Sequence, residues 1–239
     1  MKIALLGYGK MGKAIEQIAI ERGHTIGAVV DDASQWANQE NSVATCDVAI
    51  DFSMPSTAVD NIRRCFSLHV PIVVGTTGWY DQLETLVQQC QEEKQCLFVA
   101  SNFSIGMNIV FDLNRRLAKL MSRYPEYNVD ISETHHIHKL DAPSGTAITL
   151  AKEIMENNSR YQKWQLCTEE TGEKNVVPIH SERRGEVPGI HTIVYDSPID
   201  TITLSHSAKS RRGLAVGAMI AAEFVVGKEG YYTMQDLLG

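Results

Sequence analysis

Residues 2–12 read KIALLGYGKMG, a short aliphatic run that leads directly into three glycines spaced as GxGxxG. The residues that follow carry apolar side chains at helical spacing. In this setting Gly7 permits a tight turn, Gly9 lets the backbone approach a pyrophosphate, and Gly12 lets the helix pack closely on the strand. The helix N-terminus would offer free N–H groups to the phosphates. The stretch therefore predicts a dinucleotide-binding unit of Rossmann type.

Strand and helix patterns continue to alternate through the first hundred residues. The apolar runs do not alternate with polar residues, which is typical of parallel strands that are buried on both faces. Such runs occur at Thr25–Val30, Asp47–Phe52, Val70–Val74 and Cys96–Ala100. Segments with helical spacing separate them. The fold class predicted for this half is an α/β, doubly wound parallel sheet.

After Asn102 the pattern changes to a second, α+β unit. Helical spacing at Ile109–Arg123 is followed by a strand pattern, a helix from Ala147 and three further strand patterns with short links. These late strands are Val176–Ile179, Gly189–Tyr195 and Thr201–Ser205. Their succession predicts a mostly antiparallel sheet. The polar segment 157–175 is expected to form a loop, and two helices, from Leu214 and from Met234, are expected to end the chain.

Composition limits the partners. The 239 residues include 22 basic and 29 acidic side chains, a net charge of −7, which argues against a nucleic-acid or polybasic membrane-surface protein. Five cysteines without a CxxC motif suggest reduced thiols. The first residues lack an export signal, and the longest apolar stretch is too short to span a bilayer. We expect a cytoplasmic protein with a small-molecule substrate and neither a nucleic-acid nor a membrane partner.

Acidic and small polar residues follow the predicted strands. Asp31 lies 19 positions after Gly12, close to the offset of an acid that binds the ribose hydroxyls, and Asp32 follows it. Two carboxylates repel a 2′-phosphate, so they favour NADH over NADPH, although Lys10 could reach such a phosphate. The loops GTTG at 75–78 and ASNF at 100–103 are expected to line the nicotinamide side. Ordinary turn chemistry would explain Thr77 or Ser101 equally well.

Residues 130–147 read DISETHHIHKLDAPSGTA, with three histidines and a lysine in five positions. A histidine can act as a general acid near neutral pH, and a lysine can hold a carboxylate. If the run is extended, His135 and Lys139 share one face, and His136 and His138 share the other. Zinc binding by two of these histidines is the rival interpretation. It is disfavoured because no cysteine lies close and the lysine opposes a cation, so no metal is expected. A solvated histidine run without a role is the third interpretation.

A helix start follows this run at Ser144-Gly145-Thr146. Two hydroxyls and a bare backbone at the positive end of a helix would suit a substrate carboxylate. A plain serine N-cap, which needs no ligand, is the alternative.

These motifs together resemble the 4-hydroxy-tetrahydrodipicolinate reductase (dihydrodipicolinate reductase) family. The similarity rests on GxGxMG, GTTG, ASNFS and above all E-x-HHxHK-x-DAPSGTA, and it covers nearly the whole chain. It implies an oxidoreductase of the diaminopimelate route to lysine, which transfers a hydride from NADH or NADPH to the ring of 4-hydroxy-tetrahydrodipicolinate and yields tetrahydrodipicolinate. It also implies a homotetramer assembled through the second domain. The C-terminal end would return to the first domain, giving a dinucleotide-binding domain of residues 1–104 plus 212–239 and a substrate-binding and oligomerisation domain of residues 105–211.

The resemblance assigns roles residue by residue. The general acid falls on His135, its companion on Lys139, and His136 lies in the substrate pocket. The group that holds a substrate carboxylate matches Ser144, Gly145 and Thr146. The cofactor contacts match Gly7, Gly9, Lys10, Met11, Gly12, Asp31, Gly75, Thr76, Thr77, Ser101, Asn102 and Phe103. Two departures are Ile137, where a polar residue is common, and Asp130, where glutamate is common. Two other functions stay open at this point, a dehydrogenase for another amino acid or imine and a non-catalytic dinucleotide sensor.

Overall fold

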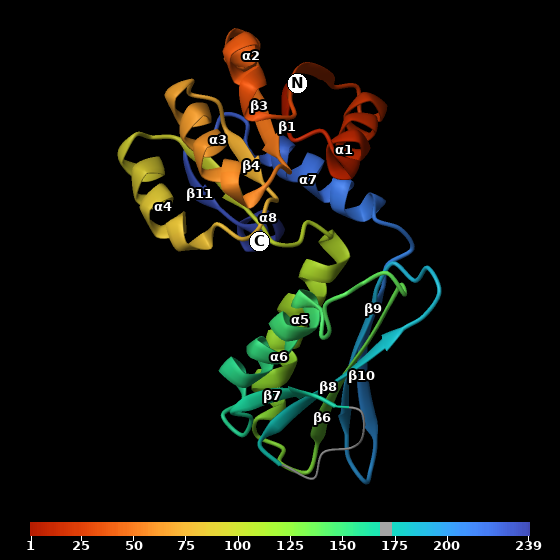
Figure 1. Cartoon of the computed structure of the whole chain (residues 1–239). Coiled ribbons are helices and arrows are strands. Elements are labelled where there is room, and N and C mark those ends of the chain that lie inside the picture. Colours follow the sequence, from red (N-terminus) through yellow and green to blue (C-terminus); the bar gives the residue numbers. More distant parts are fainter. Residues whose placement is uncertain (168–173) are drawn as a thin grey trace. The chain divides into compact units, whose positions relative to one another are not determined.

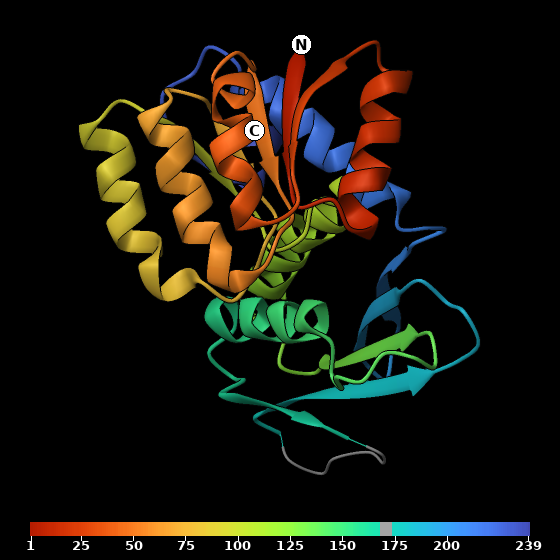
Figure 2. The ribbon, with the colours of Figure 1, turned by 45° about the horizontal axis from the view of Figure 1, so that its top comes forward.

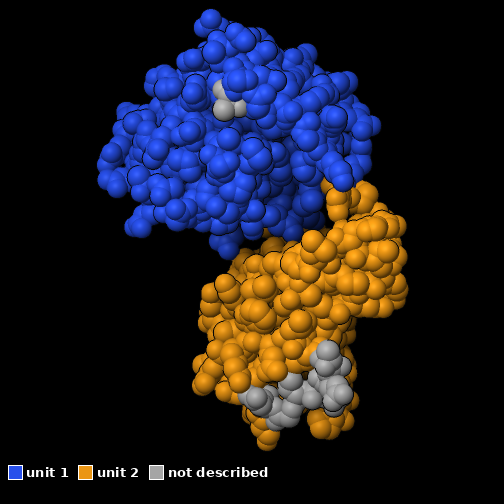
Figure 3. All heavy atoms as spheres, viewed as in Figure 1, with its two compact units in different colours: residues 1–105, 212–239 blue, residues 106–211 orange. Residues whose placement is uncertain are grey.

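The computed structural model describes residues 1–167 and 174–239, which form two compact units (Figure 3). Unit 1 comprises residues 1–105 and 212–239, and unit 2 comprises residues 106–211. The sequence-based division placed residue 105 in the second domain instead. Part of the segment expected as a loop, residues 168–173, lies outside the described residues.

Unit 1 is built on a six-stranded sheet in the order β11-β5-β4-β3-β1-β2. Every neighbouring pair is parallel, as predicted for a doubly wound fold. The strands are β1 (Lys2–Leu6), β2 (Thr25–Val30), β3 (Val48–Asp51), β4 (Ile72–Val74), β5 (Cys96–Val99) and β11 (Gly230–Tyr232). The three-residue edge strand β11 was not predicted, because its Gly-Tyr-Tyr sequence carries no apolar run.

Helices cover both faces of this sheet (Figures 1 and 2). One face, with Ile3 and Leu5, packs on α1 (Lys10–Glu21), α7 (Arg212–Val225) and α8 (Met234–Leu238). The other, with Ala4 and Leu6, packs on α2 (Trp36–Val43), α3 (Pro55–Ser67) and α4 (Leu83–Glu92). Short 3-10 turns at Ala33–Gln35 and Tyr80–Gln82 lead into α2 and α4. Helix α2 was not predicted, since only Trp36 and Val43 of its eight residues are buried.

The strand order reverses between β1 and β3. From β1 the chain continues to β2 on one side, and from β3 it continues to β4 on the other. Ligands of open α/β sheets bind beyond the carboxyl ends of the strands at such a switch point. The glycine-rich turn after β1 lies at this position, next to Phe52 after β3.

Unit 2 is built on a five-stranded sheet in the order β10-β9-β6-β8-β7. The strands are β6 (Asn128–His135), β7 (Lys163–Leu166), β8 (Val176–Arg183), β9 (Ile190–Asp196) and β10 (Thr201–Ser207). The prediction of a mostly antiparallel sheet was wrong. β6 and β10 pair antiparallel with β9, whereas β6 and β7 pair parallel with β8. β7 lies in the segment predicted as a loop, and its exposed sequence KWQL gave no strand signal.

Two helices, α5 (Ile105–Met121) and α6 (Gly145–Asn157), pack on one face of this second sheet (Figure 1). Side chains of β6 alternate between buried and accessible. Val129 and Ile131 join the core under the helices. Glu133 and His135 continue the same alternating, buried series toward the end of the strand. The strand therefore turns two polar side chains toward the helix-covered face.

None of the helices formed by the described residues combines the length and the apolar character that a membrane span needs. All five cysteines are buried free thiols.

Candidate functional site

The surroundings of the glycine turn after β1 differ among its three glycines, because a Cβ would clash at two of them and meet open space at the other. Gly7 has a φ of +87°, and a Cβ there would lie 2.4 Å from the carbonyl oxygen of Phe52. A Cβ on Gly12 would lie 2.3 Å from the carbonyl oxygen of Gly7. A Cβ on Gly9 would meet no described atom within 4 Å. Gly7 and Gly12 are therefore required by the fold, whereas Gly9 leaves the backbone of the turn accessible to a ligand.

The N-terminus of α1 suits an anion. Its N-cap residue, Gly9, forms no side-chain capping hydrogen bond, and its first turn contains no acidic residue. The backbone N–H groups there are oriented for a phosphate, and Lys10 adds an exposed positive charge. These residues fit the pyrophosphate of a dinucleotide.

The two aspartates after β2 lie differently. Oδ1 of Asp31 accepts a hydrogen bond of 2.6 Å from the backbone N–H of Tyr8, so this carboxylate lies beside the glycine turn. The Asp32 carboxylate accepts instead from the backbone N–H of Ser34 at 2.8 Å and caps its own 3-10 turn. The Ser34 hydroxyl, more than its N–H, holds the pKa of Asp32 below its usual value. Of the two aspartates, Asp31 is the one beside the glycine turn, and its role toward a ribose stays a prediction.

A buried carboxylate that sequence reasoning missed organises the loop after β4. Asp51, the last residue of β3, accepts hydrogen bonds from the Thr76 hydroxyl at 2.5 Å and from Nδ2 of Asn61 at 2.7 Å. The same Thr76 oxygen accepts from the backbone N–H of Ser53 at 2.8 Å. Burial raises the pKa of Asp51, against the lowering effect of these hydrogen bonds. Thr76 is therefore fixed inside the protein, whereas Thr77 is exposed.

The loop after β5 offers mixed contacts. Ser101 is exposed, and Oδ1 of Asn102 accepts from the backbone N–H two residues on, at 2.9 Å. Phe103 as a whole residue is 1% exposed, and its ring centroid lies 5.6 Å from that of Phe52. Its carbonyl oxygen is packed against Gly217, where a Cβ would lie 1.7 Å from it, so the predicted cofactor contact of Phe103 stays a prediction. A Cβ on Gly75 would lie 2.2 Å from the same Phe52 ring, so this glycine makes room for an aromatic side chain.

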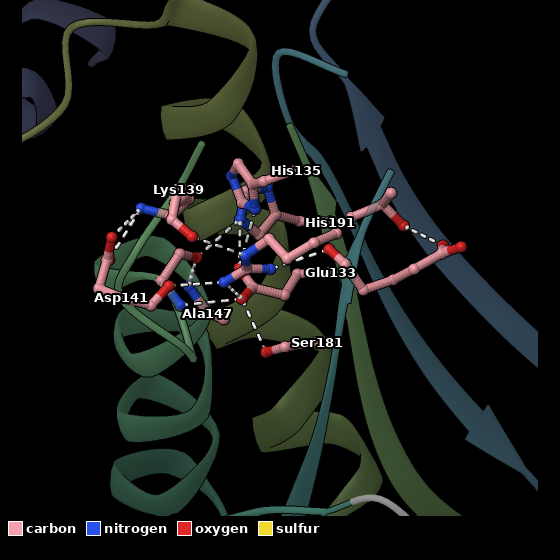
Figure 4. A network of polar contacts seen from close by, with 11 residues as sticks. Glu133, His135, Lys139, Asp141, Ala147, Ser181 and His191 are labelled. Atoms are coloured by element: carbon pink, nitrogen blue, oxygen red, sulfur yellow. Dashed lines mark hydrogen bonds and ion pairs between the residues drawn. The ribbon is translucent and has the colours of Figure 1, made fainter. Parts of the chain in front are cut away.

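The polar centre of unit 2 is Glu133, whose side chain is fully buried (Figure 4). Its Oε1 accepts from the backbone N–H of Ser144 at 3.0 Å and from the Ser181 hydroxyl at 2.8 Å. The guanidinium Nη2 of Arg183 lies 3.3 Å from the same oxygen. Oε2 lies 3.2 Å from Nδ1 of His135 and 3.6 Å from Nε2 of His191. One buried carboxylate thus joins α6, β8 and β9 to the histidine at the end of β6.

Glu133 is ionised in this setting. Burial opposes its charge most strongly, but His135, His191, Ser144 and Ser181 together outweigh burial and hold its pKa well below the usual range. Burial lowers the pKa of His191, so this ring favours its neutral form.

The histidine run does not continue β6. The strand ends at His135, and the chain then turns, with hydrogen bonds from the N–H of Ile137 to the carbonyl of Gly185 at 3.1 Å and from the N–H of Lys139 to the carbonyl of His136 at 3.1 Å. The two faces expected for an extended run are therefore wrong beyond His135. Competition from these turn hydrogen bonds is the physical reason.

The cationic side chains of the turn have partners. Nζ of Lys139 lies 2.7 Å from Oδ1 of Asp141, and this contact lowers the pKa of Asp141. Nη2 of Arg211 donates to Nε2 of His136 at 3.0 Å. Burial first, and then the Arg211 charge, lowers the pKa of His136. His138 is mostly exposed beside Glu186.

Ser144 is the N-cap of α6, which begins at Gly145, two residues before the helix start expected at Ala147. Its oxygen accepts from the backbone N–H of Ala147 at 3.2 Å and lies 3.1 Å from Nε2 of His191. The hydroxyl is buried and engaged, as in the capping alternative. Gly145 is exposed and Thr146 half-buried, so these two residues are the more accessible part of the predicted carboxylate site.

Two family models for dihydrodipicolinate reductase match the chain, the N-terminal one over residues 1–103 and the C-terminal one over residues 106–238. The chain belongs to the dihydrodipicolinate reductase family.

Relatives at full length agree with this membership. A 4-hydroxy-tetrahydrodipicolinate reductase of Christiangramia forsetii is 48% identical over 100% of this chain and 98% of its own. One from Caldanaerobacter subterraneus is 32% identical over 96% of this chain and 94% of its own. The solved structure of a dihydrodipicolinate reductase from a Paenisporosarcina species, with dipicolinate bound, matches with a TM-score of 0.75 and 25% identity, covering 98% of this chain and 97% of that one.

Family membership confirms the predicted fold class and the prediction of an NAD(P)H-dependent oxidoreductase. The roles of single residues, and the preference between the two nicotinamides, stay predictions.

Sequence reasoning missed the partners that this reductase-family site draws from distant strands. Glu133 pairs in register with Ser181 on β8 and with His191 on β9, and Arg183 ends β8. The only available signal was the period of two in β6, which places Glu133 and His135 on one face.

The predicted zinc pairs are also not the closest metal-compatible group. Among the described residues, ligand atoms of Glu133, His135 and His191 lie within 4.8 Å of one another. The adjacent Arg183 guanidinium opposes a cation there, and the expectation of no metal stays a prediction.

Proposed function

We propose that the protein reduces 4-hydroxy-tetrahydrodipicolinate to tetrahydrodipicolinate in the diaminopimelate route to lysine, with the hydride of a reduced nicotinamide dinucleotide and a proton, while the 4-hydroxyl group of the substrate leaves as water. The observation that carries the proposal is His135 at the end of β6, 3.2 Å from the ionised and buried Glu133, in a chain that both family models match. The bound dipicolinate of the Paenisporosarcina relative supports a cyclic dicarboxylate as the substrate class.

The cofactor would be held by the glycine turn and by the loops at the carboxyl ends of β4 and β5. When bound, it supplies the hydride. The backbone at Gly9 and the first turn of α1 would receive its pyrophosphate, and Asp31 its ribose hydroxyls. The charge of Asp31 beside the turn supports a preference for NADH over NADPH, against the exposed Lys10.

Unit 2 would hold the substrate. His135 would donate the proton through Nε2, because Nδ1 faces Glu133. Lys139 would exchange the Asp141 carboxylate for a substrate carboxylate. The other residues expected to bind the substrate are His136, Ser144, Gly145 and Thr146. The family resemblance further supports a cytoplasmic homotetramer assembled through the second unit.

The test is substrate-dependent loss of the reduced-nicotinamide absorbance. The substrate would be generated in situ from pyruvate and aspartate semialdehyde by the preceding synthase, with NADH and NADPH in parallel. We expect turnover, a higher kcat/KM with NADH, and a loss of about 10² to 10⁴ in kcat for His135→Gln. Folded His135→Gln with unchanged kcat would refute the general acid. NADH binding without turnover by the wild type would favour the dinucleotide sensor.

A further inference from the structure

We propose that Glu133 is a positioning residue that fixes the ring orientation of His135 and the proton on its Nδ1, so that Nε2 faces the substrate. Arg183 and the first turn of α6 hold the carboxylate in place for this task. The inference rests on the proposed function, in which His135 donates the proton.

Glu133 cannot itself touch a substrate, because its side chain is fully buried. Its Oε1 is held from three directions, by the Ser144 N–H, the Ser181 hydroxyl and the Arg183 guanidinium. Three fixed donors on one oxygen leave the carboxylate no free rotation. Oε2 is therefore aimed at the edge of the His135 ring by contacts that do not involve His135.

The contact between Oε2 and Nδ1 of His135 carries the assignment. The two atoms are 3.2 Å apart, and within the described part of the chain neither has an aligned hydrogen-bond partner. Leaving both buried atoms unsatisfied would be costly, and a proton on Nδ1 lets a small rotation of the His135 ring bring its N–H into line with Oε2 and remove that cost. The carboxylate oxygen at this distance is the acceptor that a proton on Nδ1 requires, which leaves Nε2 as the nitrogen that faces away from Glu133.

The groups around the ring leave His135 as the partner of this charge. His191 on β9 lies edge-on, with ring centroids 5.0 Å apart, and burial favours its neutral form. Arg183 on β8 contacts the far oxygen of the carboxylate. In the turn, Lys139 contacts Asp141, and His136 accepts from Arg211.

The opposite edge of the ring is kept clear. A Cβ on Gly189 would lie 3.1 Å from Nε2 of His135, tighter than ordinary contact. The missing side chain at this position therefore leaves room at the nitrogen that would deliver the proton.

Glu133→Gln tests the assignment with almost no change in shape. The three donors at Oε1 require an acceptor, so the amide oxygen would take that position and the amide NH2 would face Nδ1. The variant ring would then accept at Nδ1, carry its proton on Nε2 and lose the adjacent negative charge. We expect kcat to fall about 10²-fold, with little change in the KM for NADH. In Glu133→Gln, the decrease of kcat/KM on the alkaline side of its pH profile is expected at a lower pH than in the wild type.

Two further variants make this result specific. Glu133→Asp keeps the charge and is expected to keep the pH profile, even with a lower kcat. Glu182→Gln changes an exposed carboxylate on the adjacent strand, one residue along the register, and is expected to keep both kcat and the pH profile.

Two kinetic outcomes would overturn the inference. One is folded Glu133→Gln with wild-type kcat and pH profile. The other is a loss of kcat with an unshifted profile that Glu133→Asp shares, since that pattern indicates a merely structural carboxylate.

Nitrogen NMR of histidine-labelled protein separates this inference from the proposed function. The His135 signals, identified by their loss in His135→Gln, report which ring nitrogen carries the proton. We expect Nδ1 to be protonated in the wild type and unprotonated in Glu133→Gln. A wild type without turnover would refute the proposed reaction, whereas the same Nδ1 state in both proteins would refute the role of Glu133.

Discussion

Replacing Gly7 or Gly9 with alanine should distinguish a glycine that the fold requires from a glycine that cofactor binding requires. In Gly7→Ala the alanine would have to adopt the φ of +87° that Gly7 has. Its Cβ would also lie 2.4 Å from a backbone oxygen, a contact that only a shift of the chain relieves. The left-handed conformation alone costs about 1–2 kcal/mol, and displacing the backbone adds to it. We therefore expect Gly7→Ala to lose at least about 2 kcal/mol of unfolding free energy. Gly9 has a φ of −72°, which alanine adopts freely, and open space at its Cβ position. Its replacement should change the unfolding free energy by less than about 1 kcal/mol.

The affinity for NADH should show the complementary effect. If the pyrophosphate approaches the backbone at Gly9, a methyl group there should weaken the Kd at least about tenfold, which corresponds to about 1.4 kcal/mol. Urea unfolding followed by circular dichroism and NADH titration followed by fluorescence measure the two quantities on the same samples. Gly213→Ala, which also has open space at its Cβ position, is the control for a change from glycine to alanine away from the glycine turn. A stable Gly9→Ala variant that binds NADH like the wild type would refute the pyrophosphate site.

Three further outcomes are expected. The folded state lowers the pKa of Glu133, so its contribution to stability is present above about pH 4.5 and is lost as the pH falls below it. The difference in unfolding free energy between wild type and Glu133→Gln should then shrink in acid, and a pH-independent difference would contradict this. Asp51→Ala removes the acceptor of the Thr76 hydroxyl and should cost about 1–3 kcal/mol while weakening NADH binding, as unfolding and titration would show. Arg183→Met removes donors to the carbonyls of Lys139 and Asp141 as well as the Glu133 contact. It should cost about 2–4 kcal/mol and lower kcat, and Arg183→Lys should recover little of either, because lysine lacks the planar fork.

The cofactor half was predictable because its signals are local. A strand, a glycine turn and a helix occupy consecutive residues, and buried parallel strands stand out as apolar runs. Short elements escaped for the same reason. β7 and β11 are edge strands of four and three residues with exposed or half-buried side chains, so neither carries a period. α2 begins at Trp36, directly after a 3-10 turn, and buries only its ends.

The substrate half was harder because its partners meet through pairing between distant strands. The parallel pairing of β6 with β8 brings Ser181 opposite Glu133, across 48 residues of chain. The antiparallel pairing with β9 brings His191 opposite the same residue from the other side. No spacing within the motif at 130–147 predicts either pairing. The motif identified His135, but the side chains that orient it come from strands that the motif does not contain.

The alternation of β6 nevertheless contained a usable signal. The buried face of β6 runs through Val129 and Ile131 and then continues as Glu133 and His135. This alternation places an acidic side chain at a buried position. A glutamate in such a position needs several donors and a nearby cation, since an unpaired buried charge is too costly to keep. The next residue on that face is a histidine, two positions on, with its ring beside the carboxylate. An apolar strand face that ends in Glu-x-His therefore predicts a buried carboxylate–imidazole pair, even where the strands that complete it cannot be identified in advance.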